Sequence, residues 1–268
     1  MTAPGEIPVV AFLFADSHAH LQFPDFDADR AEAVARARAA GVGWIGTVGS
    51  DLESSRKALA LARENPGLFS TVGIHPHEAG KASEEDFRAL DALAADPACR
   101  GVGETGFDYF YKHSEPESQR RAFLREREIA VARSLPVVIH IRDAWDDFFR
   151  VLESDGRPWR GVMHCFTGGP KEAERCLSAG LFLGFSGIAT FKKADAIRAA
   201  AAACPLDRIL VETDSPYLAP EPVRGNRCEP AFVAHTAAML ARLRGEPLEA
   251  FAAATTANAR ALFGLGEF

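Results

Sequence analysis

The amino-acid sequence predicts an α/β fold, a single (β/α)8 TIM barrel with parallel strands. Short apolar segments alternate with helical patterns along nearly the whole chain. The 268 residues also suit a barrel, which typically needs about 250. The first apolar segment is not followed by a glycine-rich phosphate loop, so the alternative, an open doubly wound sheet, is less favoured. No linker rich in Gly, Ser or Pro divides the chain, and we therefore expect one domain over residues 1–268.

The predicted strands are short apolar runs bounded by Gly, Pro or polar residues. Near-continuous apolar character is typical of parallel strands that are buried on both faces. The expected ranges are 9–15, 43–48, 68–74, 101–104, 136–141, 161–164, 181–185 and 208–211.

Predicted helices separate these strands, and several carry recognisable signals at their ends. Gly41 follows the first helix as a C-cap, and Asp51 can cap the second. Ser83 and Asp86 match the capping-box pattern, with Asp in place of the usual Glu or Gln. The expected helical ranges are 27–40, 51–64, 83–95, 116–133, 143–153, 170–179 and 193–203, with further helical patterns in 229–263.

The overall charge excludes one class of function. A net charge of -7 disfavours a protein that coats nucleic acid nonspecifically, because such binding depends on clustered Lys and Arg. An enzyme that acts on a phosphodiester remains possible, since bound divalent metal ions reverse the local field inside a cleft.

Cysteine usage and the absence of a leader pattern suggest where the protein works. The five cysteines are scattered and contain no C-x-x-C, so neither a disulfide framework nor a zinc ribbon is indicated. The N-terminus lacks a basic segment, and no apolar run reaches the ~20 residues that a membrane span needs. We therefore expect an unexported protein of the reducing cytoplasm, with no membrane association.

Imidazole and carboxylate side chains gather at the carboxyl ends of the predicted strands. Active sites of such barrels lie at this end, so these side chains are expected to meet there. Taken singly, each has a structural explanation, such as a core histidine for His140 or a turn residue for Asp214. Their joint occurrence at one end of one barrel favours a metal site. The residues are His18, His20, His75, His77, Glu104, His140, His164 and Asp214.

Imidazoles and carboxylates are the usual ligands of zinc, manganese and related divalent ions, and a carboxylate can bridge two ions. The expected ligands of one ion are His18, His20 and Asp214. Those of a second ion are His140 and His164, with Glu104 bridging the pair. Two such ions lower the pKa of a shared water molecule and stabilise the attacking and leaving oxygens of a displacement. The pattern predicts a hydrolase.

Seven ordered motifs are spread over almost the whole chain. They are DSHAHL at 16–21, GIHPHE at 73–78, VGETGFDYF at 102–110, VVIHIRDA at 137–144, MHCFTGG at 163–169, VETDSPYLAP at 211–220 and TTANARALFGL at 255–265. Through these motifs the sequence resembles the TatD-family metal-dependent deoxyribonucleases, a branch of the amidohydrolase-like barrels.

This resemblance implies the same six metal ligands, and it implies a substrate role for His75. It also implies activity with magnesium, whereas the histidine-rich ligand set suits zinc or manganese. Two positions depart from the family pattern: Gln22 stands where many relatives carry Asp, and Cys228 stands where Asn is usual. Neither is a proposed ligand, but both bear on specificity.

The expected reaction is attack of a metal-activated water molecule on phosphorus, with Asp214 and Glu104 as the catalytic carboxylates and Asp214 as general base. Other side chains have expected supporting roles. Arg142 and Arg224 lie in loops where a guanidinium can hold a phosphate, while Arg227 is better explained as a surface residue. The residues expected to orient the ligands are Glu212, Asp108, Tyr109 and Asp16.

The function expected from these features is an exonuclease-like deoxyribonuclease that acts on DNA ends, with single strands favoured and two Mg, Mn or Zn ions as cofactors. An alternative is an amide or ester hydrolase of the same barrel type, such as a D-aminoacyl-tRNA deacylase, because the same attack serves a carbonyl. A second alternative is a metal-binding scaffold without catalysis. The complete ligand set disfavours this scaffold.

Overall fold

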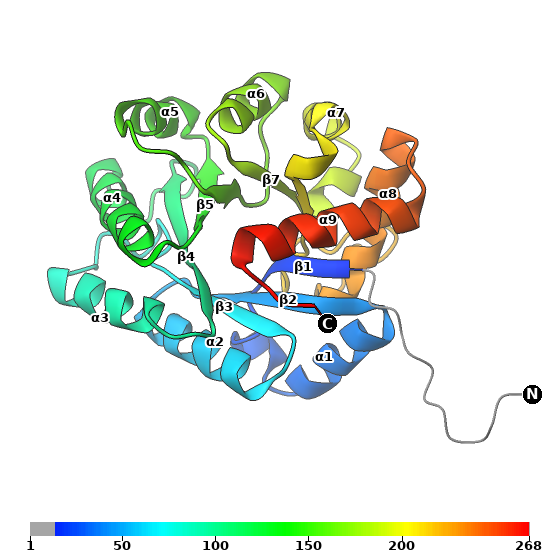
Figure 1. The fold of residues 1–268 in the computed structure, drawn as a ribbon, viewed down its shortest axis with the longest axis horizontal. Coiled ribbons are helices and arrows are strands. Elements are labelled where there is room, and N and C mark those ends of the chain that lie inside the picture. The colour runs from blue at the N-terminus through cyan, green and yellow to red at the C-terminus, as the bar shows by residue number, and fades with distance from the viewer. Residues whose placement is uncertain (1–13, 268) are drawn as a thin grey trace, which may run out of the picture.

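The computed structural model describes residues 14–267, which form a parallel eight-stranded barrel surrounded by helices (Figure 1). The strands are β1 (Phe14–Ala19), β2 (Val42–Val48), β3 (Leu68–Val72), β4 (Cys99–Asp108), β5 (Val137–Arg142), β6 (Gly161–Met163), β7 (Phe182–Phe185) and β8 (Ile209–Val211). The α-helices are α1 (Arg30–Ala39), α2 (Leu52–Glu64), α3 (Glu84–Ala94), α4 (Pro116–Arg133), α5 (Trp145–Ser154), α6 (Pro170–Ser178), α7 (Asp195–Ala203), α8 (Val233–Arg244) and α9 (Leu248–Phe263). Short 3-10 helices are η1 (Pro24–Phe26), η2 (Gly187–Thr190), η3 (Leu206–Arg208) and η4 (Pro230–Phe232).

The strands pair in sequence order from β1 to β8, and every pair is parallel. Backbone hydrogen bonds between the ends of β1 and β8 bring the first and last strands together. The N–H of His20 donates to the carbonyl of Ser215 at 2.7 Å, and the N–H of Asp214 donates to the carbonyl of His18 at 2.8 Å. The predicted barrel is confirmed, and its closing contact involves residues beside the proposed ligands.

The sequence signals at the helix ends act as expected. The Ser83 hydroxyl accepts a 3.2 Å hydrogen bond from the backbone N–H of Asp86, and the Asp86 carboxylate accepts a 2.8 Å bond from the N–H of Ser83. This is the predicted capping box, with Asp serving as well as Glu. The Asp51 carboxylate accepts from the N–H of Ser54 at 2.7 Å and caps α2.

Two strand predictions were wrong in their bounds by more than two residues. Most of the predicted first strand, 9–15, lies outside the described residues, and β1 continues to Ala19 rather than ending before Asp16. The predicted fourth strand, 101–104, is a fragment of the longer β4. Polar residues in both segments suggested strand ends, but these polar side chains are buried. Asp16 is paired with Thr213, and His18 faces Glu104. The expectation of one domain over residues 1–268 stays a prediction.

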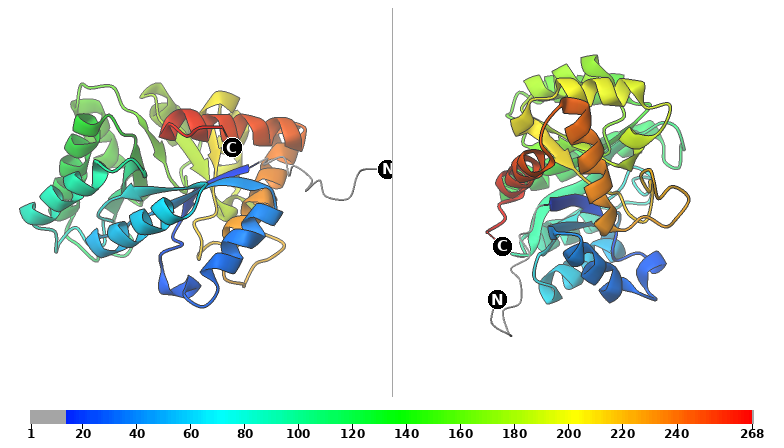
Figure 2. Two further views of the ribbon diagram at one scale, coloured as in Figure 1. Left: turned by 60° about the horizontal axis from the view of Figure 1, so that its bottom comes forward. Right: turned by 90° about the vertical axis from the view of Figure 1, so that its right-hand side faces the viewer.

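Helix α9 closes the amino-terminal end of the barrel. Its last turn and the residues after it, including Leu262, Phe263 and Leu265, share an apolar cluster with residues near the starts of six strands. The ring centroids of Phe69 and Phe263 are 4.8 Å apart. Figure 2 shows α9 (red) beside α8 (orange), and both helices contact β1. Because α9 covers the amino-terminal end of the barrel, a functional site is expected at the carboxyl-terminal end.

Within residues 14–267, no helix combines the length and the hydropathy that crossing a membrane requires.

Candidate metal centre

The six proposed ligands converge at the carboxyl end of the barrel. His18 lies within β1, Glu104 within β4 and His140 within β5. His20, His164 and Asp214 lie in the first residues beyond β1, β6 and β8. Neighbouring strands of a barrel direct side chains inward at this end, so residues far apart in sequence meet. Groups of three among these side chains place their ligand atoms within 4.8 Å of one another.

One group contains His18, His20 and Asp214, the set assigned to one ion from the sequence. The Nε2 atoms of His18 and His20 face each other at 3.2 Å. Asp214 Oδ1 lies 3.8 Å from His18 Nε2 and 3.6 Å from His20 Nε2. The other ring nitrogen of His20 lies 2.8 Å from the Val48 carbonyl, which fixes the orientation of the ring.

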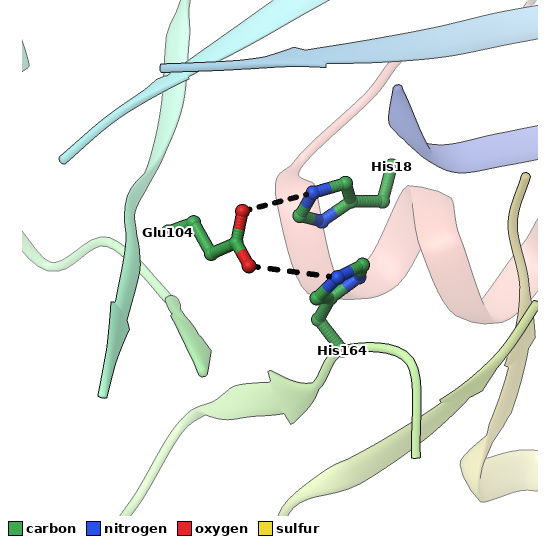
Figure 3. A group of neighbouring side chains, drawn as sticks. All are labelled: His18, Glu104 and His164. Atoms are coloured by element: carbon green, nitrogen blue, oxygen red, sulfur yellow. Dashed lines mark ion pairs between the residues drawn. The ribbon is translucent and has the colours of Figure 1, made fainter. Parts of the chain in front are cut away.

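Glu104 lies between the histidines, and its two oxygens face different partners. Oε2 is 3.4 Å from His18 Nε2 and 3.6 Å from His20 Nε2. Oε1 is 2.9 Å from His140 Nδ1 and 3.6 Å from His164 Nε2. Figure 3 shows the carboxylate directing one oxygen toward His18 and the other toward His164. This is the geometry that a bridging carboxylate needs.

The structure groups His140 and His164 differently from the sequence assignment. His140 forms a group with Glu104 and His75, whose Nε2 is 3.5 Å from Glu104 Oε1. The ring of His164 stacks on that of His18 at a centroid distance of 3.4 Å, and its Nε2 is 3.7 Å from Asp214 Oδ1. His164 therefore lies between the two ends of the cluster, and His75 lies as close to Glu104 as the proposed ligands do.

Electrostatics indicate that the cluster suits a cation. Burial alone raises the pKa of Glu104, but the imidazoles of His75 and His164 and their neighbours bring it well below its usual value. Burial opposes the charge on His164, yet the carboxylates of Glu212, Asp214 and Glu104 raise the pKa of His164 to about 10. Buried carboxylates thus draw positive charge onto the histidines. Nitrogen and carboxylate donors facing one another in a buried site fit divalent ions.

Two further carboxylates contact the second ring nitrogens of two proposed ligands, His140 and His164. Asp108 Oδ2 lies 3.4 Å from His140 Nε2 and 2.8 Å from His77 Nε2. Glu212 Oε1 lies 2.8 Å from His164 Nδ1. Both carboxylates are buried. Their positions agree with the orienting roles expected from the sequence, because a carboxylate beside the second ring nitrogen of a ligating histidine fixes its tautomer and direction.

Asp16 and Tyr109 lie outside this arrangement. Asp16 accepts hydrogen bonds from the hydroxyl of Thr213 at 2.6 Å and from its N–H at 2.8 Å, so it connects β1 to the segment that carries Asp214. Burial raises the pKa of Asp16 to about 8, against these hydrogen bonds. The Tyr109 hydroxyl donates to Asp147 at 2.6 Å and so faces α5 rather than the ligands.

The two arginines that were expected to bind phosphate lie in different surroundings. Arg142 follows His140 on β5 and places its guanidinium carbon 4.1 Å from the ring centroid of Phe110. Arg224 is exposed and stacks on Phe191 at 3.6 Å. Arg227 forms an ion pair with Asp29 at 2.7 Å, in keeping with a surface role.

Sequence reasoning missed Cys165 as a member of the cluster. Its sulfur forms a group with His164 and Asp214, and its backbone N–H donates to Glu212 at 2.5 Å. Position after a strand end was the available signal, since Cys165 directly follows His164. His77 was noted at a strand end but received no role, and it contacts Asp108.

The two departures from the family pattern are accommodated without exposed or unpaired groups. Gln22 donates to the Val48 carbonyl at 2.6 Å and to Ser54 at 2.9 Å, and it accepts from Thr47 at 2.8 Å. Cys228 is buried. Gln22 thereby shares the Val48 carbonyl with His20 and contributes to the fixed orientation of that ring.

A parallel barrel with imidazoles and carboxylates converging at the carboxyl ends of its strands defines a class of metal-dependent hydrolases. The family described as TatD related DNase matches residues 15–264. The chain belongs to this family.

The chain is similar to several known proteins over nearly its full length. The chain is 36% identical over 249 residues to the Bacillus subtilis protein named uncharacterized metal-dependent hydrolase YabD, covering 92% of this chain and 98% of the relative. It is 40% identical over 248 residues to a protein of Cronobacter turicensis named 3'-5' ssDNA/RNA exonuclease TatD, covering 89% and 93%. The crystal structure of the TatD homologue YjjV from Escherichia coli K12 superimposes with a TM-score of 0.91 at 31% identity, covering 96% and 100%. The family and the ligand cluster together support the use of divalent metal ions.

Proposed function

We propose that this protein is a metal-dependent exonuclease that hydrolyses phosphodiester bonds at the ends of single-stranded DNA or RNA. One observation carries the proposal: Glu104 directs its two carboxylate oxygens toward two groups of histidines at the mouth of a barrel. Relatives that this chain matches over at least nine-tenths of their length are named nucleases. These names support a nucleic-acid substrate over an amide or a lactone.

Two divalent ions are proposed, with Glu104 shared between them. His18, His20 and Asp214 would hold one ion, and His140 and His164 would hold the other. When bound, such ions lower the pKa of a water molecule and neutralise charge that develops on the phosphoryl oxygens. The nitrogen-rich donor set favours Mn or Zn over Mg, which prefers oxygen donors.

Asp214 is the proposed general base. Its side chain is 14% exposed, against 5% for Glu104, so it is the more accessible of the two central carboxylates. The Asp214 carboxylate accepts the proton of the attacking water molecule as the new phosphorus–oxygen bond forms. The bond to the leaving sugar oxygen breaks, and that oxygen takes a proton from solvent. The Nε2 atoms of His20 and His164 lie 3.6 and 3.7 Å from Asp214 Oδ1 and flank the proposed base.

The test is hydrolysis of an end-labelled single-stranded DNA by protein freed of metal with chelator and then supplied with Mg, Mn or Zn. We expect activity to return with metal and to fall at least about a hundredfold in Glu104→Gln and Asp214→Asn. The exposed Glu249→Gln change on α9 is a matched control that keeps wild-type activity. Wild-type protein that releases no nucleotide with any of the three metals, yet hydrolyses an aminoacyl-tRNA or a lactone, would overturn the proposal.

The proposed location is the cytoplasm. The cysteines are free thiols, and most of them are buried, in keeping with a reducing compartment.

A further inference from the structure

Two groups of aromatic side chains flank the metal centre. The exposed large apolar side chains of residues 14–267 include three aromatic ones, Phe110 at 53%, Tyr111 at 51% and Tyr217 at 53%. All three lie in loops that follow a strand at its carboxyl end, as the metal ligands do. A large aromatic ring that is half exposed beside an active site is available for contact with a substrate.

The two groups lie on opposite sides of the barrel mouth. Phe110 and Tyr111 follow β4, and Tyr217 follows β8. In a closed ring of eight strands in sequence order, β4 and β8 are four strands apart and therefore face each other across the barrel. We call Phe110, Tyr111 and Arg142 the β4 platform, and Tyr217 with its neighbour Phe23 the β8 platform.

Each platform is attached to the metal centre by direct contacts. Asp108 Oδ1 accepts from the N–H of Phe110 and from the N–H of Tyr111, both at 2.9 Å. The other oxygen of Asp108 contacts His77 and His140. On the opposite side, the rings of His20 and Phe23 stack at 4.6 Å, and the Tyr217 ring centroid lies 6.4 Å from each of them. The platforms are thus fixed relative to the ligands.

Arg142 gives the β4 platform a positive charge. Its guanidinium carbon lies 4.1 Å from the centroid of Phe110 and 4.6 Å from that of Tyr111. Among the described residues, no carboxylate forms an ion pair with this guanidinium, which leaves its donors for another anion. An arginine stacked on aromatic rings beside a metal centre can contact both the bases and the phosphates of a nucleic-acid strand.

We propose that the β4 and β8 platforms are stacking subsites for the bases of a single-stranded nucleic acid, on either side of the phosphate that reaches the metal centre. This inference rests on the proposed nuclease function and names how the substrate is held. Unpaired bases expose their π-faces, and stacking on aromatic rings is tolerant of sequence. Paired bases in a duplex are stacked on one another, so the platforms favour single strands.

The test compares the affinity of metal-loaded protein for two labelled DNA strands of the same length. One strand carries bases, and the other is abasic throughout. Both carry hydrolysis-resistant phosphorothioate linkages, and fluorescence anisotropy at constant ionic strength gives each Kd. We expect the wild type to bind the base-bearing strand about tenfold or more tightly than the abasic one, as stacking of one base or more predicts. Tyr111→Leu and Tyr217→Leu should each lower this ratio severalfold, while Tyr111→Phe and Tyr217→Phe should keep it.

A matched control is Leu206→Ala, an exposed apolar change that precedes β8 at the other end of the barrel. It should leave the ratio unchanged. Tyr111 and Tyr217 lie on separate loops, so one variant still tests the inference if thermal melting shows that the other is misfolded. A wild-type ratio near one, or Leu variants that keep the wild-type ratio, overturns the stacking subsites. Failure of the nuclease proposal is recognised separately, as wild-type protein that releases no nucleotide from an unmodified strand.

Discussion

Glu212 Oε1 lies 2.8 Å from His164 Nδ1, on the edge of the ring opposite to the nitrogen that faces Glu104. The same carboxylate accepts from the N–H of Cys165 at 2.5 Å and from the hydroxyl of Ser17 at 3.0 Å. It therefore ties β8 to β1 and to the segment after β6. One buried side chain sets the direction of a central imidazole.

Replacing this carboxylate should weaken metal binding. Glu212→Gln keeps the shape of the side chain but removes the charge that orients His164, and such changes typically cost 10- to 100-fold in metal affinity, or about 1.4–2.8 kcal/mol. Isothermal titration with Mn2+ measures the effect. Glu153→Gln, on the exposed face of α5, is the matched control. Equal affinities for wild type and Glu212→Gln would contradict the orienting role.

Metal should stabilise the fold. An ion that binds only the folded chain adds about 2.7 kcal/mol at a free concentration one hundred times its Kd. For a chain of this size we expect the melting temperature to rise by about 5–10 °C when metal is restored to chelator-treated protein. Differential scanning calorimetry measures the shift. In Glu104→Ala the rise should be much smaller, because the carboxylate proposed to bridge the ions is absent, and an undiminished rise would place the stabilising ion elsewhere.

Glu126 predicts a pH dependence of stability. Burial raises the pKa of Glu126 well above its usual value, against hydrogen bonds from the Thr105 hydroxyl at 2.5 Å and the Ile74 N–H at 2.8 Å. A carboxyl whose folded-state pKa is raised contributes stability that is fully present below its unfolded-state pKa and is lost as pH rises through the folded-state pKa.

The Glu126→Gln variant imitates the protonated form, since its amide can donate to Thr105 and accept from Ile74. We expect it to be more stable than the wild type at pH 8, with an advantage that shrinks toward pH 5 by at most about 1.4 kcal/mol per pH unit. Urea unfolding at several pH values measures the difference. A difference that does not vary with pH would show that Glu126 has no raised pKa.

Gly106 should not tolerate a side chain. Its φ is +142°, and a Cβ atom there would lie 2.0 Å from the carbonyl oxygen of His140 on the neighbouring strand. We expect Gly106→Ala to lower the free energy of unfolding by about 3 kcal/mol or more, because backbone strain and forced repacking each cost about 1–3 kcal/mol. Gly156→Ala, at φ +67° with open space around the Cβ, should cost only about 1 kcal/mol. Urea denaturation of the two variants distinguishes them, and similar losses would contradict the close approach of β4 to β5.

The positions of strand-end residues were accessible from the sequence, because the pattern of apolar runs is local. Runs such as residues 136–141 indicate strands, and one general rule places their carboxyl ends together. That reasoning was enough to gather His18, Glu104 and Asp214 into one site. It failed for β4, where the buried Glu104 looked like the end of the strand and Asp108 looked like part of the following loop.

Which side chains actually touch was decided only by the tertiary structure. His75 approaches Glu104, Tyr109 faces Asp147, and Arg142 lies on Phe110. Spacing along the chain gives the side of a strand from which a residue projects. It does not give the partner across the barrel, because that partner depends on strand register, bulges and the space left by neighbouring side chains. The sequence by itself determined the barrel and the kinds of donors at its mouth, and the packing of eight strands determined how those donors are paired.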